Sequence, residues 1–175
     1  MQCYAFYMSS SNTRRSGYGH HFAVLAKILN LKGDKQGAIA AMKSAVDLDP
    51  EVGDAHFYYA LLLVESKDIE RGVAELHRAE ALGRVARNAG EASVLGGFLG
   101  DAGSYKESEK QFLRALFYQP DDSESKMKLG LVYYWDHDRD AARRTISEVM
   151  KVHDLRKADQ YPAFRPILLD LGLEK

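Results

Sequence analysis

Two stretches of the chain repeat the same pattern of apolar and small residues at helical spacing. Residues 38–50 and 108–120 each place a small residue, a large apolar residue and an alanine four and then three positions apart, and each ends in a proline. Proline cannot continue a helix, so each pattern predicts a helix that stops just before it. Upstream, residues 22–29 and 92–99 show a further helical pattern with a small residue, Ala26 or Gly96, on its inner side. Each pair of patterns predicts a helix hairpin.

The same frame fits the regions between and after these two hairpins. Four units then begin near residues 19, 53, 89 and 123 and cover 19–52, 53–86, 89–122 and 123–156. Residues typical of turns divide each unit in two, at 32–34, 66–68, 102–104 and 136–138. The pattern therefore predicts eight helices arranged as four hairpins.

The period and its residue types resemble the tetratricopeptide repeat, a 34-residue helix-turn-helix unit with conserved small and large apolar positions and a closing proline. Unit one carries the pattern most fully, and units three and four keep the Leu-Gly pair at 95–96 and 129–130. The departures are His56 and Lys126 at the opening aromatic position and Arg84 and Asp154 at the closing proline. The resemblance implies an all-α, right-handed helical-repeat solenoid of about four units.

Small residues support this resemblance on physical grounds. Ala26, Ala60, Gly96 and Gly130 occupy the position where the two helices of a hairpin approach most closely, and a larger side chain there would push them apart. One hairpin cannot bury its apolar face alone, so stacking of hairpins supplies the core.

The flanking segments differ from the repeats. Residues 1–18 are expected to form a flexible N-terminal lead. In the segment 157–175, Phe164, Ile167, Leu168 and Leu171 recur at the spacing of an amphipathic helix. We expect this helix to cap the apolar end of unit four. The alternative is that it docks into the groove of a neighbouring molecule and gives a homodimer.

Composition narrows the class of protein. The 175 residues include 24 basic and 25 acidic side chains, and this balance argues against a nucleic-acid partner, which would favour a basic excess. Cys3 is the only cysteine, so neither an internal disulfide nor a CxxC-type zinc cage is expected. No apolar run approaches the length of a membrane-spanning helix, so membrane insertion is not expected. A cytoplasmic location is the expectation, with a periplasmic location or a place within a larger protein left open.

No residue cluster predicts catalysis, a metal or a cofactor. The run Asp136-His137-Asp138-Arg139-Asp140 has the residue types of a metal site, but it falls on the turn of unit four, where solvated and capping residues are common. Gly17-Tyr18-Gly19 lacks the third glycine and the preceding strand of a dinucleotide loop. We therefore expect a protein that is not an enzyme.

The family resemblance also implies a binding surface. In such repeats the first helix of each hairpin lines a concave groove that usually holds a peptide. The residues that the resemblance places there are Lys27 and Asn30, then Phe57, Tyr58 and Leu61, then Val94, and finally Met127, Lys128, Leu131, Tyr134 and Trp135. Phe57, Leu61 and Leu131 have a second interpretation, in which they pack between hairpins.

Some members of the family bind the C-terminal carboxylates of Hsp70 or Hsp90 through a basic cluster in this groove. The matching positions here hold Ala23, Lys27, Phe57 or Tyr58, Gly90 and Val94, so a single cation remains. An apolar peptide or amphipathic helix fits this surface better. The sequence thus favours a non-enzymatic interaction module acting as an adaptor, assembly factor or chaperone. The alternative is a self-associating scaffold whose tail helix or N-terminal Tyr4, Phe6 and Tyr7 fill a neighbour's groove.

Overall fold

A computed structural model describes residues 18–156 and 164–174 of the chain, and every regular element among them is a helix. Most of the expected lead and the segment 157–163 lie outside these residues. After a first helix whose described residues are 18–31, the helices are α2 (Lys35–Leu48), α3 (Gly53–Glu65), α4 (Ile69–Ala81), α5 (Ala89–Asp101), α6 (Tyr105–Tyr118), α7 (Ser123–Trp135), α8 (Arg139–Met150) and α9 (Phe164–Asp170). The all-α helical-repeat fold predicted from the sequence is confirmed.

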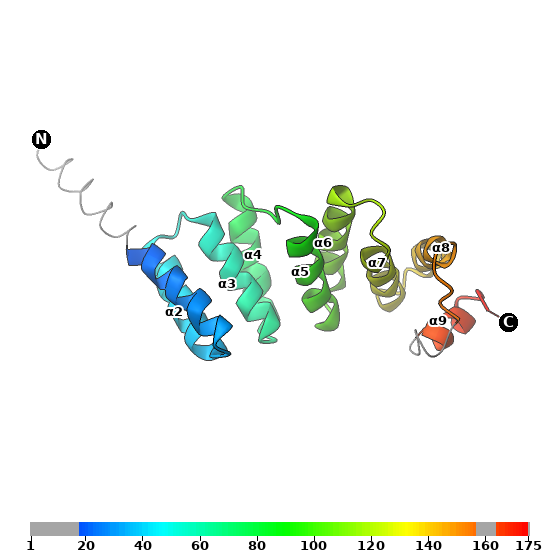
Figure 1. The fold of residues 1–175 in the computed structure, drawn as a ribbon, viewed down its shortest axis with the longest axis horizontal. Helices are drawn as coiled ribbons and strands as arrows, with labels where there is room; N and C mark the ends of the chain where they lie inside the picture. Colours follow the sequence, from blue (N-terminus) through cyan, green and yellow to red (C-terminus); the bar gives the residue numbers. More distant parts are fainter. Residues whose placement is uncertain (1–17, 157–163, 175) are drawn as a thin grey trace, which may run out of the picture. The chain divides into compact units, whose positions relative to one another are not determined.

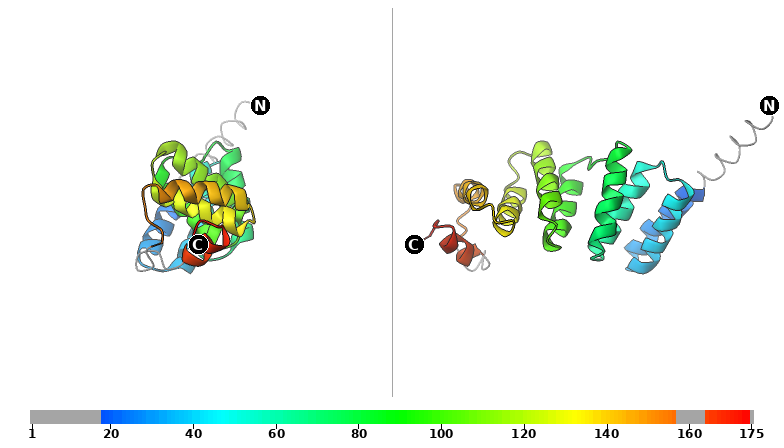
Figure 2. Two further views of the ribbon diagram at one scale, coloured as in Figure 1. Left: turned by 90° about the vertical axis from the view of Figure 1, so that its right-hand side faces the viewer. Right: turned by 180° about the vertical axis from the view of Figure 1, so that it is seen from behind.

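The helices form two compact units, Met1–Val85 and Ala86–Lys175. Within the first unit, α3 packs against both α4 and α2; within the second, α5 packs on α6 and α7 on α8. The paired helices lie side by side in both Figure 1 and Figure 2. Each unit therefore holds two consecutive hairpins.

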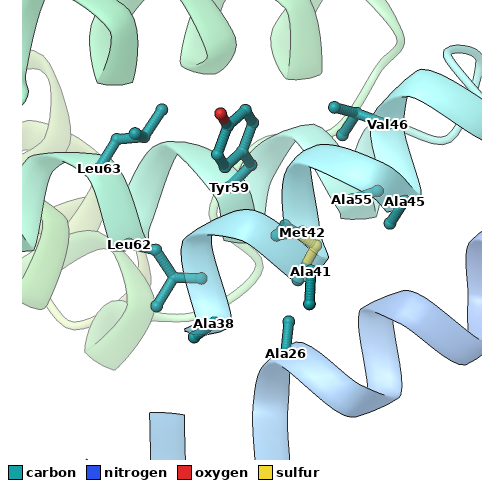
Figure 3. Close-up of a cluster of buried hydrophobic side chains, with 10 residues drawn as sticks. All are labelled: Ala26, Ala38, Ala41, Met42, Ala45, Val46, Ala55, Tyr59, Leu62 and Leu63. Carbon is teal, nitrogen blue, oxygen red and sulfur yellow. The ribbon is translucent and has the colours of Figure 1, made fainter. Parts of the chain in front are cut away.

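The core of the first unit is built from small residues that face large ones (Figure 3). Ala26 of the first helix and Met42 of α2 are 0% and 1% exposed, and Tyr59 and Leu62 of α3 cover the other side of α2. The alanines of α2 let the helices on both sides approach closely. This packing explains why the small positions recur with the period of the repeat.

Glycines serve the same purpose in the second unit. A Cβ added at Gly130 would lie 2.7 Å from Cγ1 of Ile146, and one added at Gly96 would lie 3.2 Å from the ring of Phe112. Both glycines are buried within their hairpins. The expected close approach of α5 to α6 and of α7 to α8 is thus observed.

All four hairpin turns have the same backbone conformation. The middle residue of each turn has a positive φ, with 83° at Gly33, 68° at Lys67, 78° at Gly103 and 66° at His137. Glycine adopts this left-handed conformation readily, whereas a side chain carries a steric cost. The predicted turn positions are therefore confirmed, and two of the four hold residues poorly suited to them.

Helix α9 caps the second unit. Phe164, Ile167 and Leu168 are buried in one cluster with Ile146 and Val149 of α8. Figure 2 shows α9 beside α8. Nε of Arg143 also donates to the carbonyl of Leu171 at 2.8 Å. The helix thus covers the apolar end of its own chain.

Candidate functional site

All eleven residues of the predicted groove lie on the first helices of the hairpins. Seven of them line two separate hollows, one in each unit. Hollow 1 in the first unit takes in Lys27, Asn30, Tyr58 and Leu61, and hollow 2 in the second takes in Lys128, Leu131 and Trp135.

Hollow 1 has a volume of about 320 Å³ and lies between the first helix and α3. Its floor is apolar, and Glu65 and Leu31 lie among its walls. Nζ of Lys27 is 4.3 Å from the centroid of the Tyr58 ring, a cation–π contact. Nζ of Lys35 holds Glu65 at 2.8 Å. The complete lining is Ala26, Lys27, Asn30, Leu31, Met42, Tyr58, Leu61, Leu62 and Glu65. Such a hollow can accept an apolar side chain of a peptide, while its polar residues can contact the peptide backbone.

Hollow 2 has a volume of about 570 Å³ and exists because α5 lacks side chains where it faces α7. A Cβ built on Gly97 would meet no heavy atom within 4 Å. Trp135 is 53% exposed at this hollow, and Nζ of Lys128 pairs with Glu124 at 2.7 Å. The complete lining is Gly97, Gly100, Asp101, Tyr105, Phe112, Lys128, Leu131, Val132 and Trp135. The space can accept a large side chain.

Tyr134 contacts Trp135 but does not itself line hollow 2. Its ring meets that of Trp135 edge-on at 5.0 Å between centroids, and it packs against the cluster formed by α8 and α9. A hydrogen bond to Asp170 raises the pKa of the Tyr134 phenol. Tyr134 therefore ties the cap to α7 and orients Trp135.

Three other predicted groove residues also lie outside the hollows. Phe57 is 2% exposed, with the guanidinium of Arg84 4.0 Å from its ring centroid, so the expected exposed position is not observed. Met127 packs against the cap cluster, as Tyr134 does. Val94 is 50% exposed but lines neither hollow. Packing thus takes Phe57 and Met127 out of the predicted surface, whereas Val94 stays exposed.

The repeat pattern missed several residues that shape the hollows. Tyr105 opens α6, and Asp101 ends α5 beside it. Both stand next to the turn at 102–104, whereas the prediction drew only on first helices. Their place beside a turn already marked in the sequence was the signal that could have found them.

A third hollow, of about 410 Å³, lies on the charged side of the first unit between α2 and α4. Its polar groups contact one another: Lys43 pairs with Asp47 at 2.5 Å, and Arg71 donates a hydrogen bond to the hydroxyl of Tyr59 at 2.5 Å. The hydrogen bond that Lys43 donates to Asp47 raises the pKa of Lys43. The lining is Lys43, Val46, Asp47, Pro50, Tyr59, Arg71, Glu75 and Arg78. Because these groups are largely satisfied internally, we interpret this hollow as structural.

His56 is the buried polar residue beneath that network, although it stands at an aromatic position of the repeat. It is 1% exposed, and its Nδ1 lies 2.5 Å from Oε2 of Glu75. Its Nε2 lies 2.9 Å from the carbonyl oxygen of Pro50. Both ring nitrogens are thus used to join α3 to α4 and to the end of α2.

The turn of unit four uses its charged residues for structure. A carboxylate oxygen of Asp138 accepts from the backbone N–H of Ala141 at 3.0 Å and caps α8. Asp136 pairs with Lys106 at 2.6 Å, as Arg139 does with Asp170. Within the described residues no three His, Cys, Asp or Glu side chains are grouped to hold a metal ion. Nor does this part of the chain contain a helix with the length and apolarity needed to cross a bilayer.

Comparison with known sequences identifies the repeat directly. Residues 32–87 match the family model of the tetratricopeptide repeat. A comparison with curated proteins finds no match.

Solved structures extend the match along the chain. A crystal structure of YrrB, described as a TPR protein with an unusual peptide-binding site, has a TM-score of 0.60 at 18% identity, covering 74% of this chain and 66% of YrrB. PilF of Pseudomonas aeruginosa has a TM-score of 0.55 at 22% identity, and the match covers 80% of this chain and 63% of PilF. MamA has a TM-score of 0.63 at 19% identity, and the match covers 88% of this chain and 79% of MamA. The chain thus spans slightly less than two thirds of the first two proteins. At these identities the similarity is one of fold.

Proposed function

We propose that this chain, a tetratricopeptide repeat protein, is a non-enzymatic interaction module that holds an apolar peptide or an amphipathic helix of a partner protein. The fold is that of protein-interaction modules in general. YrrB, which shares it, is described as having a peptide-binding site. Hollow 1 and hollow 2, each within its own unit, would each take anchoring side chains of such a ligand.

The observation that carries the proposal is the open floor of hollow 2. The missing side chain of Gly97 leaves apolar space beside the half-exposed Trp135. Large aromatic side chains at partly open positions are typical anchors of protein interfaces. An anchor buried there would contribute roughly 1–3 kcal/mol, so two or three anchors correspond to a micromolar complex after the cost of ordering the peptide.

The chemistry of the linings favours binding over catalysis. No His, Cys or Ser lines hollow 1 or hollow 2. The two lysines are engaged, Lys27 over the Tyr58 ring and Lys128 with Glu124. We propose an adaptor, assembly-factor or chaperone role on this basis. The alternative of a scaffold joined by swapped tails has less support, because α9 covers the end of its own chain.

The test fills hollow 2 from the inside. A displayed library of random peptides is selected on the wild-type chain, and the affinity of each enriched peptide is measured by fluorescence anisotropy. The Cβ of a leucine at position 97 would meet no heavy atom within 4 Å, so we expect Gly97→Leu to retain the fold while binding falls at least tenfold. Gly90→Leu on the same helix is the matched control, because Gly90 is exposed and lines neither hollow.

Hollow 1 is tested in the same way with Tyr58→Ala, against Phe117→Ala as an exposed aromatic elsewhere. Phe117 is 80% exposed and lines neither hollow. The proposal is overturned if no peptide is enriched, or if enriched peptides bind both hollow variants as tightly as the wild type.

A further inference from the structure

The outward side of the first helix carries an apolar strip that we call the edge face, made of Val24, Leu25 and Ile28. These side chains are 42%, 43% and 45% exposed. Neither hollow is lined by any of them. Leu31, 88% exposed, lies at the boundary between the edge face and hollow 1. An apolar strip of this kind on a helix usually faces a partner.

The next repeat shows what covers this face when a helix precedes it. Leu25 and Ile28 correspond, 34 residues later, to Tyr59 and Leu62 of α3. Those two are 3% and 7% exposed and are packed in one cluster with Ala41, Ala45 and Val46 of α2. The equivalent surface of α3 is thus covered by an antecedent helix with small apolar residues. In the described part of the chain, no helix precedes the first one.

Charge indicates the chemistry of a helix that could cover this face. No Asp or Glu occurs before Asp34, and the first 33 residues contain Arg14, Arg15, Lys27 and Lys32. Their formal charge is +4, so the remaining residues carry −5 of the total of −1. His21 and Lys32 lie in line with the edge face, one before it and one in the turn after it, and Lys27 lies beside Val24. A complementary partner must bring carboxylates beside its apolar strip.

We propose that the edge face binds an amphipathic helix of another polypeptide, with small apolar residues on its contact side and acidic residues flanking them. The helix would lie on the first helix as α2 lies on α3. The segment 1–17 is a poor occupant, because it has two arginines and no carboxylate. The same face of a second copy is equally basic. This interaction is separate from peptide binding in the hollows.

The probes are two synthetic helical peptides of about 18 residues, long enough to be partly helical alone. Both carry alanine and valine on one side; one flanks them with glutamate and the other with lysine. We expect the glutamate peptide to bind the full chain in fluorescence anisotropy and the lysine peptide to bind at least tenfold more weakly. Added salt should weaken the first complex.

Ile28→Glu puts a negative charge in the centre of the edge face, and this charge should weaken binding of the glutamate peptide at least tenfold. The matched control is Leu113→Glu on α6, where the leucine is 48% exposed. Circular dichroism verifies that both variants fold. Peptides selected for the hollows should bind Ile28→Glu normally, so failure of this proposal is distinct from failure of the proposed function.

Four results would overturn the inference. The first is that the glutamate peptide does not bind the wild-type chain. The second is that Ile28→Glu binds this peptide as tightly as the wild type does, and the third is that the lysine peptide binds the wild type as tightly as the glutamate peptide does. The fourth is a different occupant: wild-type dimers that Ile28→Glu dissociates, which assign the face to a second copy, or Ile28-dependent binding to phosphatidylglycerol vesicles, which assigns it to an anionic membrane surface.

Discussion

The guanidinium of Arg84 lies 4.0 Å from the centroid of the Phe57 ring and covers it. Nε of Arg84 also donates to Oδ1 of Asp54 at 2.6 Å, and the arginine is 3% exposed. Position 84 is where the repeat pattern has its closing proline. The arginine that replaces the proline therefore makes a buried contact, which holds the segment after α4 against α3.

Replacing Arg84 should destabilise the first unit. Arg84→Ala uncovers Phe57 and removes the ion pair, and we expect a loss of about 2–3 kcal/mol in the free energy of unfolding. This is less than the roughly 3–5 kcal/mol of a fully buried pair, because Asp54 is half exposed. Arg84→Met keeps the apolar cover and should lose about half as much. Urea unfolding measures both.

The control for Arg84 is Arg78→Ala, an exposed arginine on α4 that should change stability by less than about 0.5 kcal/mol. Equal stability of Arg84→Ala and the wild type would show that the contact contributes nothing.

Lys67 and His137 occupy turn positions that suit glycine. Their φ values of 68° and 66° match those of Gly33 and Gly103 at the equivalent turns. Lys67→Gly and His137→Gly should each stabilise the chain by about 1 kcal/mol, because relief of the left-handed strain exceeds the added entropy of the unfolded chain. Thermal unfolding measures the gain. Gly33→Ala is the reverse control and should destabilise; a loss of stability in both glycine variants would contradict the argument.

Gly130 and Gly97 lie on facing helices of the second unit and should respond oppositely to alanine. Alanine favours a helix by about 1 kcal/mol over glycine at either site. At Gly97 the new methyl group enters open space, whereas at Gly130 it lies 2.7 Å from the buried Ile146. Because the helix propensity gain is common to both, their difference in unfolding free energy isolates the clash, expected at about 1–3 kcal/mol.

Chemical denaturation of the two alanine variants measures that difference. Gly130→Ala should be the less stable. Equal stabilities would mean that α7 and α8 separate without cost.

The sequence predicts the helices and turns well because the repeat encodes them locally. The small residues at Ala26 and Gly130, and the turns centred on Gly33 and Lys67, follow from a period of about 34 residues. The surface was harder to predict, since a period defines which helix a residue is on but not what covers it. The sequence left Phe57 open between a groove position and a packed one, because nothing in the repeat pattern predicts that Arg84 covers it.

The cap illustrates the same limit from a different element. Tyr134 and Met127 have groove positions in the repeat frame, yet both pack against the cluster formed by α8 and α9. The pattern predicted α9 as a cap but not which side of α7 it reaches. Gly97 differs from these residues, because there the lack of a side chain leaves the open space of hollow 2.

Tyr133 should make the second unit sensitive to alkali. Burial, assisted by the negative charge of Glu109 and the hydrogen bond to it, raises the pKa of Tyr133 to about 12 from the ordinary tyrosine value of 10.0. Between these two values the folded chain retains a proton that the unfolded chain has lost. The free energy of unfolding therefore falls as the pH rises through this window, and the contribution is complete below pH 10. We expect the wild type to lose stability relative to Tyr133→Phe only within that range. Denaturant unfolding of both proteins across the range measures the effect, with the tyrosinate absorbance difference reporting the ionisation itself; stability curves that stay parallel up to pH 12 would contradict it.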